Sequence, residues 1–298
     1  MKLNKLSLRD KQLFTKYLGL DRHDLSVFAF ANLYIWSKLF DIEWGLIENS
    51  LCIFFKDRLG CFLYLPPLVK KINKSAIDEA FKIMDSLNKN TEISRIENIE
   101  EKDLDNYRKF GFECKIKSYD YICERSTLVE LRGDSFKSKR ASLNYFLKHY
   151  QFELSPITAS DKESCLDLYK QWMSARLSKN SDSFYRWMME DSLKSLKEAL
   201  DNYTELGFEG MAVRINNELK GFTFGYKLNK DTFCILYEIA DLSAKGLAQL
   251  IFKEFSISLS DYKYINIMDD SGLANLKKVK LSYHPRFAPP AYIATRKL

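Results

Sequence analysis

Charged side chains that could do chemistry are concentrated near the end of the chain, in the stretch YINIMDDSGLANLKKVKLSYHP. The residues concerned are Asp269, Asp270, Lys277, Lys278 and Lys280. Two interpretations are open. Aspartates that start a helix and lysines that end it complement the helix dipole, which is a purely structural role. The same residues at the rim of a site would instead hold an anionic substrate.

Positive charge is unevenly distributed along the chain. The net charge of +6 over 298 residues does not by itself indicate a nucleic-acid-binding protein. However, residues 271–298 contain no Asp or Glu, and a second basic run, KSKRASLNYFLKHY, covers residues 137–150. Taken alone, each run is typical of an ordinary solvent-exposed surface. If the two converge in space, they would border a positively charged groove.

Metal, disulfide and membrane sites are not indicated. The six cysteines form no C-x-x-C pair and several lie in apolar runs, which is typical of reduced core residues in a cytosolic protein. With only three scattered histidines, we expect no metal site. The N-terminus MKLNKLSLRDKQLF is polar, and no apolar run approaches the length of a membrane span. We therefore expect a cytoplasmic protein without a transmembrane segment.

The elements that must position these residues occur twice. In each half the pattern predicts a three-strand meander, a helix, a strand, a helix and a final strand. The first half has its meander at 41–66, helices at 75–87 and 100–112, and strands at 93–99 and 118–124. The second has helices at 161–177 and 183–200, a meander at 210–241, a helix at 246–259, and strands at 264–267 and 290–297.

This repetition predicts a mixed α+β (α/β) protein of two tandem domains. We place the first domain at residues 1–132 and the second, which carries the candidate site, at residues 151–298. Residues 133–150 read as a basic bridging helix with Leu143 and Phe146 turned inward. A cleft between two such domains is a favoured place for a ligand.

The order of elements resembles the GNAT acyltransferase fold, present twice, with a mixed and mostly antiparallel sheet flanked by helices. YRKFGFE (107–113) resembles the helix-to-strand turn of that superfamily. SAKGLA (243–248) stands where the superfamily binds pyrophosphate; Gly246 and Ala248 fit the motif, whereas Ser243 departs from it. The equivalent loop of the first half, LPPLVKKINKSA, has no glycine, so we expect no coenzyme A there.

Longer motifs resemble the C-terminal domain of phosphatidylglycerol lysyltransferase, especially its stand-alone relatives, over nearly the whole chain. The motifs are LRGDSFKSKRASLNYF (131–146), YEIAD (237–241) and the stretch 264–285. Ile267 and Met268 depart from the pattern, since relatives carry charged or amide residues there. The membrane-spanning half of true lysyltransferases has no counterpart here, so we expect no direct action on membrane lipid.

The resemblance, which extends to Fem-type aminoacyltransferases, implies the roles of individual residues. Glu238, Asp241 and Tyr283 become the catalytic candidates, as amine ligand, base or proton donor. Purely structural roles remain open for Glu238 and Tyr283. The candidates for binding substrate or cofactor are Lys139, Arg140, Asn144, Ser243, Gly246, Ala248, Asn266, Asp270, Lys277 and Lys280.

Three functions follow from the resemblance. The first is an aminoacyltransferase that takes its group from aminoacyl-tRNA, binds the tRNA acceptor end and acts on a small-molecule or peptide amine or a hydroxyl. The second is an N-acyltransferase that uses acetyl-CoA. The third is a binding protein on a GNAT scaffold without chemistry, in which replacing Glu238 would have no effect.

Overall fold

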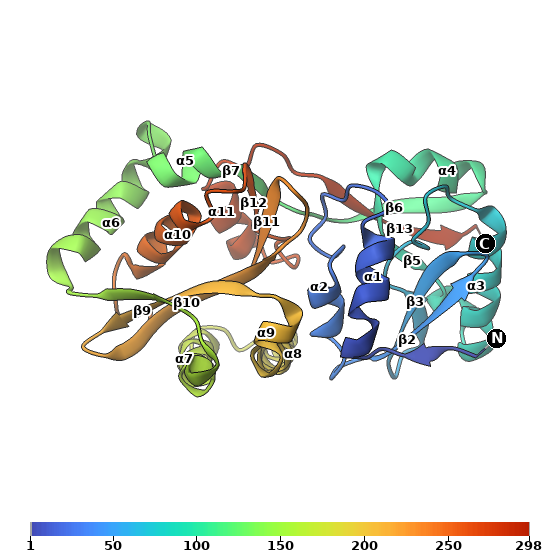
Figure 1. Ribbon diagram of the computed structural model, residues 1–298, viewed down its shortest axis with the longest axis horizontal. Coiled ribbons are helices and arrows are strands. Elements are labelled where there is room, and N and C mark those ends of the chain that lie inside the picture. Colours follow the sequence, from blue (N-terminus) through green and yellow to red (C-terminus); the bar gives the residue numbers. More distant parts are fainter. Residues whose placement is uncertain (1, 298) are drawn as a thin grey trace. The chain divides into compact units, whose positions relative to one another are not determined.

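The computed structural model describes residues 2–297, and they form two compact units (Figure 1). Unit 1 comprises Met1–Asp120, Asp269–Leu273 and Ala288–Leu298. Unit 2 comprises Tyr121–Met268 and Ala274–Phe287. Each unit is built on one mixed sheet flanked by helices.

Unit 1 has a seven-stranded sheet in the order β1-β2-β3-β4-β5-β13-β6. The strands are β1 (Asn4–Lys5), β2 (Asp41–Ile47), β3 (Ser50–Lys56), β4 (Cys61–Leu63), β5 (Ile96–Glu100), β6 (Phe112–Tyr119) and β13 (Pro290–Arg296). The helices are α1 (Lys11–Leu18), α2 (Phe30–Tyr34), α3 (Lys74–Leu87) and α4 (Leu104–Lys109), with the short 3₁₀ turns η1 (Leu8–Asp10), η2 (Thr91–Ile93) and η3 (Glu101–Asp103). The strands β4 and β5 run parallel and are paired at Leu63 and Ile96.

Unit 2 has a six-stranded sheet in the order β7-β12-β11-β10-β9-β8. The strands are β7 (Ile122–Glu124), β8 (Glu153–Pro156), β9 (Glu209–Ile215), β10 (Glu218–Lys227), β11 (Thr232–Ala240) and β12 (Tyr264–Asn266). The helices are α5 (Arg125–Glu130), α6 (Lys137–His149), α7 (Lys162–Leu177), α8 (Ser183–Asp201), α9 (Tyr203–Leu206), α10 (Leu247–Ser258) and α11 (Ala274–Leu281), with the 3₁₀ turns η4 (Asp134–Phe136) and η5 (Ala159–Asp161). Helix α7 lies against one face of β10 and β11, and α10 and α6 lie on the other (Figure 1).

Local signals in the sequence account for the positions of these elements. Asn216 and Asn217 both have positive φ (51° and 63°), as the tight turn between β9 and β10 requires. The capping box at Ser7 is formed, because the Asp10 carboxylate accepts a hydrogen bond from the Ser7 backbone N–H at 2.8 Å. All six cysteines are free thiols, and all but Cys114 are buried.

The last strand pairs differently from the expectation. We expected residues 290–297 to complete the second half, but β13 lies in the sheet of unit 1, antiparallel to both β5 and β6. In turn, β7 from the first half pairs with β12 in unit 2. Alternation of apolar residues predicts a strand but not its partner, since any free sheet edge offers the same backbone groups.

The basic helix is part of unit 2 rather than a separate bridge. Leu143 and Phe146 of α6 do turn inward, and they join the buried core that α10 and β11 form. The boundaries expected at residues 132 and 151 therefore differ from those of the compact units, which divide after Asp120. The reason is tertiary: an apolar stripe on a helix packs wherever a matching core exists.

Candidate functional site

The strands β11 and β12 diverge in the centre of unit 2. They run parallel and are paired at three positions, the last of which joins Cys234 to Asn266. There β12 ends, whereas β11 continues to Ala240. The pairing of β10 with β11 also shifts after Phe224, so that Leu236 is an extra residue on β11. The last residues of β11 thus extend past the end of β12.

Glu238 lies on the part of β11 that extends past β12, where its backbone pairs with Thr223 of β10. Its neighbour Tyr237 is buried on the face toward α8, where its hydroxyl donates a hydrogen bond to the Ser192 carbonyl at 2.9 Å. Successive side chains of a strand alternate between faces, so Glu238 points away from α8, toward the lysines of α6 and α11 that act on its charge. Within residues 2–297, no group donates a hydrogen bond or forms an ion pair to its partly buried carboxyl group.

The protonation of Glu238 is strongly perturbed. Burial raises the pKa of its carboxyl group to about 8, and the positive charges of Lys280 and Lys139 oppose that rise without cancelling it. At pH 7 such a group is about one tenth ionised. It is therefore placed to take up or release a proton near neutral pH, which is the property that general acid–base catalysis requires.

Lys139 is held in the first turn of α6. Its ammonium group donates a hydrogen bond to the Ser282 hydroxyl at 2.8 Å and lies 3.6 Å above the centroid of the Tyr283 ring. This cation–π contact compensates part of the cost of removing the ammonium group from water. Burial lowers the pKa of Lys139, while the nearby Glu238 carboxyl group acts in the opposite direction.

Lys280 reaches the same region from α11. Its ammonium group donates a hydrogen bond to the backbone carbonyl of Ile267, just beyond the end of β12. The two lysines therefore lie 141 positions apart in the sequence, on different helices, and both act electrostatically on Glu238. The expected convergence of the two basic runs is found at this point of unit 2.

The ring of Tyr283 lies beneath the ammonium group of Lys139. Its ring is buried and packs against Phe252 of α10, with ring centroids 4.4 Å apart. Burial raises the pKa of its phenol well above the ordinary value, and the charge of Glu238 adds to the effect. A phenol in this setting stays protonated, so packing and the cation–π contact account for Tyr283 better than proton donation does.

Asn266 and Asp270 shape the chain between β12 and α11. The Asn266 side chain is buried and accepts a hydrogen bond from the Met268 N–H at 2.7 Å, in a turn where Met268 has φ of 62°. Asp270 accepts a hydrogen bond from the Gly272 N–H at 3.0 Å. Because α11 begins only at Ala274, Asp270 supports the preceding turn rather than the helix start itself.

The loop after β11 is largely satisfied by its own hydrogen bonds. The Asp241 carboxylate accepts from the N–H and hydroxyl of Ser243 at 2.9 and 2.6 Å, and it lies 3.4 Å from the Lys220 ammonium group. Partial burial raises the pKa of Asp241, but these donors outweigh it and hold the pKa below the ordinary value. Asp241 is therefore an ionised turn former, unlike Glu238.

Gly246 is required by a neighbouring helix. Its φ is +91°, and a Cβ there would lie 2.1 Å from the Ser142 carbonyl oxygen and 3.0 Å from the Cβ of Phe146. The backbone of α6 thus occupies the space that a phosphate would need beside this glycine. Ala248 follows in the first turn of α10, partly buried.

Three other predicted site residues lie at the edges of this arrangement. Arg140 donates hydrogen bonds to the carbonyls of Leu131 and Gly133, so it holds the loop before α6. Asn144 and Lys277 are exposed on α6 and α11. Two groups were not predicted, namely the Ser282 hydroxyl and the Ile267 carbonyl that anchor the lysines; the KLSYHP motif already contained Ser282.

Comparisons with known proteins confirm the resemblance seen in the sequence. The family model described as "Phosphatidylglycerol lysyltransferase, C-terminal" matches residues 21–295. No curated protein is similar enough to be matched. Within residues 2–297, none of the helices combines the length and apolar character needed to cross a lipid bilayer.

Solved structures show the same fold. A conserved protein of unknown function from Bacteroides thetaiotaomicron VPI-5482 is 26% identical, with a TM-score of 0.89 and all of both chains covered. The L-PGS structure from Bacillus licheniformis is 16% identical, with a TM-score of 0.65 over 97% of this chain and 92% of that one.

Two more distant structures bear on the fold alone. FemX is 9% identical with a TM-score of 0.53, over 98% of this chain and 97% of that one. A tandem GNAT protein from the clavulanic acid biosynthesis pathway is 7% identical with a TM-score of 0.52, over 99% and 98%. The expected fold class, two tandem GNAT-like arrangements of mixed sheet and helices, is confirmed.

Proposed function

Because the chain belongs to the phosphatidylglycerol lysyltransferase C-terminal domain family, we propose that it is an aminoacyltransferase whose proton-transfer group is Glu238. Family and fold indicate an acyltransferase-like role. The observation that carries the finer proposal is the Glu238 carboxyl group, which has no partner within residues 2–297 and has its pKa raised to about 8 between two lysines. The family's name includes a lysyl transfer, which supports an aminoacyl group as the one moved.

The proposed reaction moves an aminoacyl group from the ester of an aminoacyl-tRNA to an amine or hydroxyl. The nucleophile attacks the ester carbonyl while the Glu238 carboxylate accepts its proton. Lys280 and Lys139 are near enough to stabilise the negative charge on the carbonyl oxygen in the tetrahedral intermediate. The carbon–oxygen bond to the tRNA ribose then breaks, and the proton on Glu238 passes to the departing ribose hydroxyl.

A donor based on coenzyme A is less well supported by the loop after β11. A pyrophosphate cradle needs free backbone N–H groups at a helix start. Here the N–H groups of Ser243, Ala244 and Leu247 donate to Asp241 and Ala244 instead. Gly246, the glycine of the loop, faces the backbone of α6.

The direct test supplies tRNA charged with radiolabelled amino acid and follows label transfer to three acceptors. The acceptors are small amines, peptide amines and vesicles of phosphatidylglycerol, with labelled acetyl-CoA as the competing donor. We expect transfer from charged tRNA, and a loss of roughly 100-fold or more in Glu238→Gln, since general acid–base groups contribute at least that much. Binding of tRNA should weaken steeply as salt is raised.

Two lysines of α11 provide a test variant and its matched control. Lys280→Gln should slow transfer, because it removes a charge next to Glu238. Lys278→Gln should leave the rate unchanged, because Lys278 is exposed on α11. Full activity of Glu238→Gln would refute the role of Glu238, and labelling by acetyl-CoA alone would replace aminoacyl-tRNA as the donor.

A further inference from the structure

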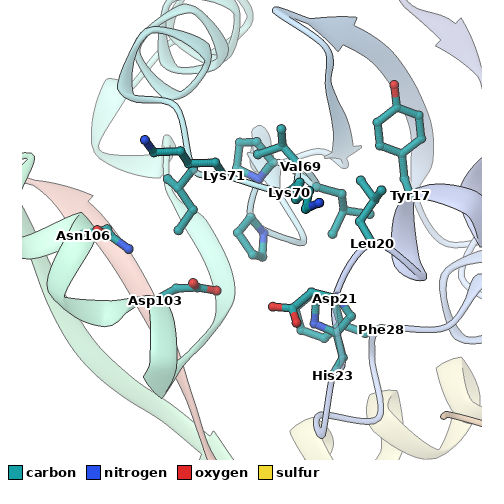
Figure 2. Close-up of a pocket in the computed structure, with 14 residues that line it drawn as sticks. Tyr17, Leu20, Asp21, His23, Phe28, Val69, Lys70, Lys71, Asp103 and Asn106 are labelled. Carbon is teal, nitrogen blue, oxygen red and sulfur yellow. The ribbon is translucent and has the colours of Figure 1, made fainter. Parts of the chain in front are cut away.

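Unit 1 contains a pocket that the proposed reaction does not use. It has a volume of about 230 Å³ and is formed by the loop between β4 and α3, the segment after α1, and the start of α4 (Figure 2). This loop, which contains Pro66 and Pro67, is the counterpart of the loop after β11 in unit 2. The pocket therefore occupies, in unit 1, the position next to the parallel strand pair β4–β5.

The walls of the pocket are fixed by contacts within unit 1. Leu68 exchanges both backbone hydrogen bonds with Leu51, at 3.0 and 2.9 Å. The ring of His23 stacks on Phe28 with centroids 3.9 Å apart, and its Nδ1 lies 2.7 Å from the Glu100 carboxylate. Prolines in the loop restrict its backbone further. A preformed wall lowers the ordering cost that a ligand must overcome.

Charges of both signs line the pocket on opposite sides. Figure 2 shows Lys70 and Lys71 on one side and Asp103 and Asp21 on the other. The Asp21 carboxylate already lies 2.8 Å from the Lys102 ammonium group. The Asp103 carboxyl group has no hydrogen bond or ion pair to any residue from 2 to 297, and the side chain is partly buried.

Asp103 is therefore the acid available to a ligand. Burial raises the pKa of its carboxyl group, which a bound cation would reverse. Asn106 lies one helical turn further on and also lines the pocket, with its polar side-chain amide on the same face. A positively charged group beside Asp103 would therefore meet a carboxylate in a polar setting.

The volume limits the size of that ligand. Each water molecule in the liquid takes up about 30 Å³, so a pocket of about 230 Å³ holds on the order of eight non-hydrogen atoms. This is the size of an amino acid and far below that of coenzyme A. A simple anion such as phosphate would meet the lysines but also the unpaired Asp103, which repels it.

We propose that this pocket binds a compact zwitterion, a free amino acid or a molecule of that type, with its carboxylate toward Lys70 and Lys71 and its ammonium group toward Asp103. The binding site is separate from Glu238, and it stands whether or not the chain transfers aminoacyl groups. It gives unit 1 a small-molecule site of its own, next to a loop whose lack of glycine argues against coenzyme A.

Ligand-observed NMR on the full chain tests this proposal. The probes are an equimolar mixture of free amino acids, the half-molecules propionate and ethylamine, and inorganic phosphate. We expect at least one amino acid to bind, and neither half-molecule nor phosphate to bind as tightly. Asp103→Asn and the double variant Lys70→Gln/Lys71→Gln should each weaken that binding roughly tenfold or more, the usual effect of losing a charged hydrogen bond.

Two controls separate this site from others. Asp105→Asn, a change at an 81% exposed side chain two residues away, should not alter binding, and neither should Glu238→Gln. Thermal unfolding verifies that each variant is folded, and the exposed lysines provide a test even if Asp103→Asn is unstable. The proposal is overturned if no amino acid binds, if phosphate or a half-molecule binds as tightly, or if Glu238→Gln abolishes binding while Asp103→Asn does not.

Discussion

The raised pKa of Glu238 predicts how the stability of the protein depends on pH. Its folded-state pKa is about 8, against an ordinary value of 4.5. Between these pH values the folded protein keeps a proton that the unfolded chain has released. Raising the pH through this window therefore destabilises the folded state, and the loss is complete above about pH 8.

Glu238→Gln removes this titration, because a glutamine is neutral at every pH. A shift from 4.5 to about 8 corresponds to at most about 5 kcal/mol, at about 1.4 kcal/mol per factor of ten in proton affinity. Part of the side chain remains exposed to water, which screens the charge. We therefore expect the variant to be about 2 to 3 kcal/mol more stable than the wild type near pH 9, and within about 1 kcal/mol of it near pH 5, where the unfolded chain has begun to ionise.

Urea unfolding followed by circular dichroism measures this difference. Both proteins are unfolded at constant ionic strength from about pH 5 to about pH 9, so that the other titrating groups cancel in the comparison. Glu163→Gln, at a 76% exposed side chain, serves as the matched control and should show a difference that does not change with pH. A difference between Glu238→Gln and wild type that is flat across this range would refute the assignment of the raised pKa.

Three further outcomes follow from the geometry. Gly246→Ala should cost roughly 2–4 kcal/mol of unfolding free energy, because the new Cβ meets the Ser142 carbonyl at 2.1 Å and φ is +91°. The control Gly133→Ala, where φ is +83° but the space is open, should cost only about 1–2 kcal/mol. Equal losses of stability in denaturant unfolding would contradict the contact between Gly246 and α6. Phe146→Ala should lower the unfolding free energy by about 3–5 kcal/mol in the same measurement, since its fully buried ring joins α6 to the core of unit 2. A loss below about 1 kcal/mol would mean that Phe146 does not hold α6 against that core. Lys139→Met should raise the pKa of Glu238 further, so the pH–rate profile of the proposed aminoacyl transfer should move to higher pH. An unmoved profile would show that Lys139 does not act on Glu238.

Local elements could be predicted from the sequence because they depend on neighbouring residues. The hairpin turn at Asn216-Asn217 needs two residues that tolerate positive φ, and both asparagines adopt it. The helix expected at 183–200 is observed at Ser183–Asp201, where Asp182 caps its first turn. The motif residues Lys139, Lys280 and Glu238 were also named from the sequence, and the structure brings them together.

Pairing and environment were decided by the tertiary structure. The strand Pro290–Arg296 pairs in unit 1, because a strand pattern fixes which side chains face the core but not which edge receives it. The resemblance makes Gly246 a candidate for binding a cofactor phosphate, whereas the close approach of α6 is what requires a glycine there.

By itself, the sequence determined the order of the helices and strands and the residues of the motifs, because periodicity and turn chemistry are local properties. Only the tertiary structure decided that Asp241 is an ionised turn former while Glu238, three positions earlier, holds its proton to about pH 8. The two carboxyl groups differ in burial and in available donors, and both are set by segments distant in the sequence.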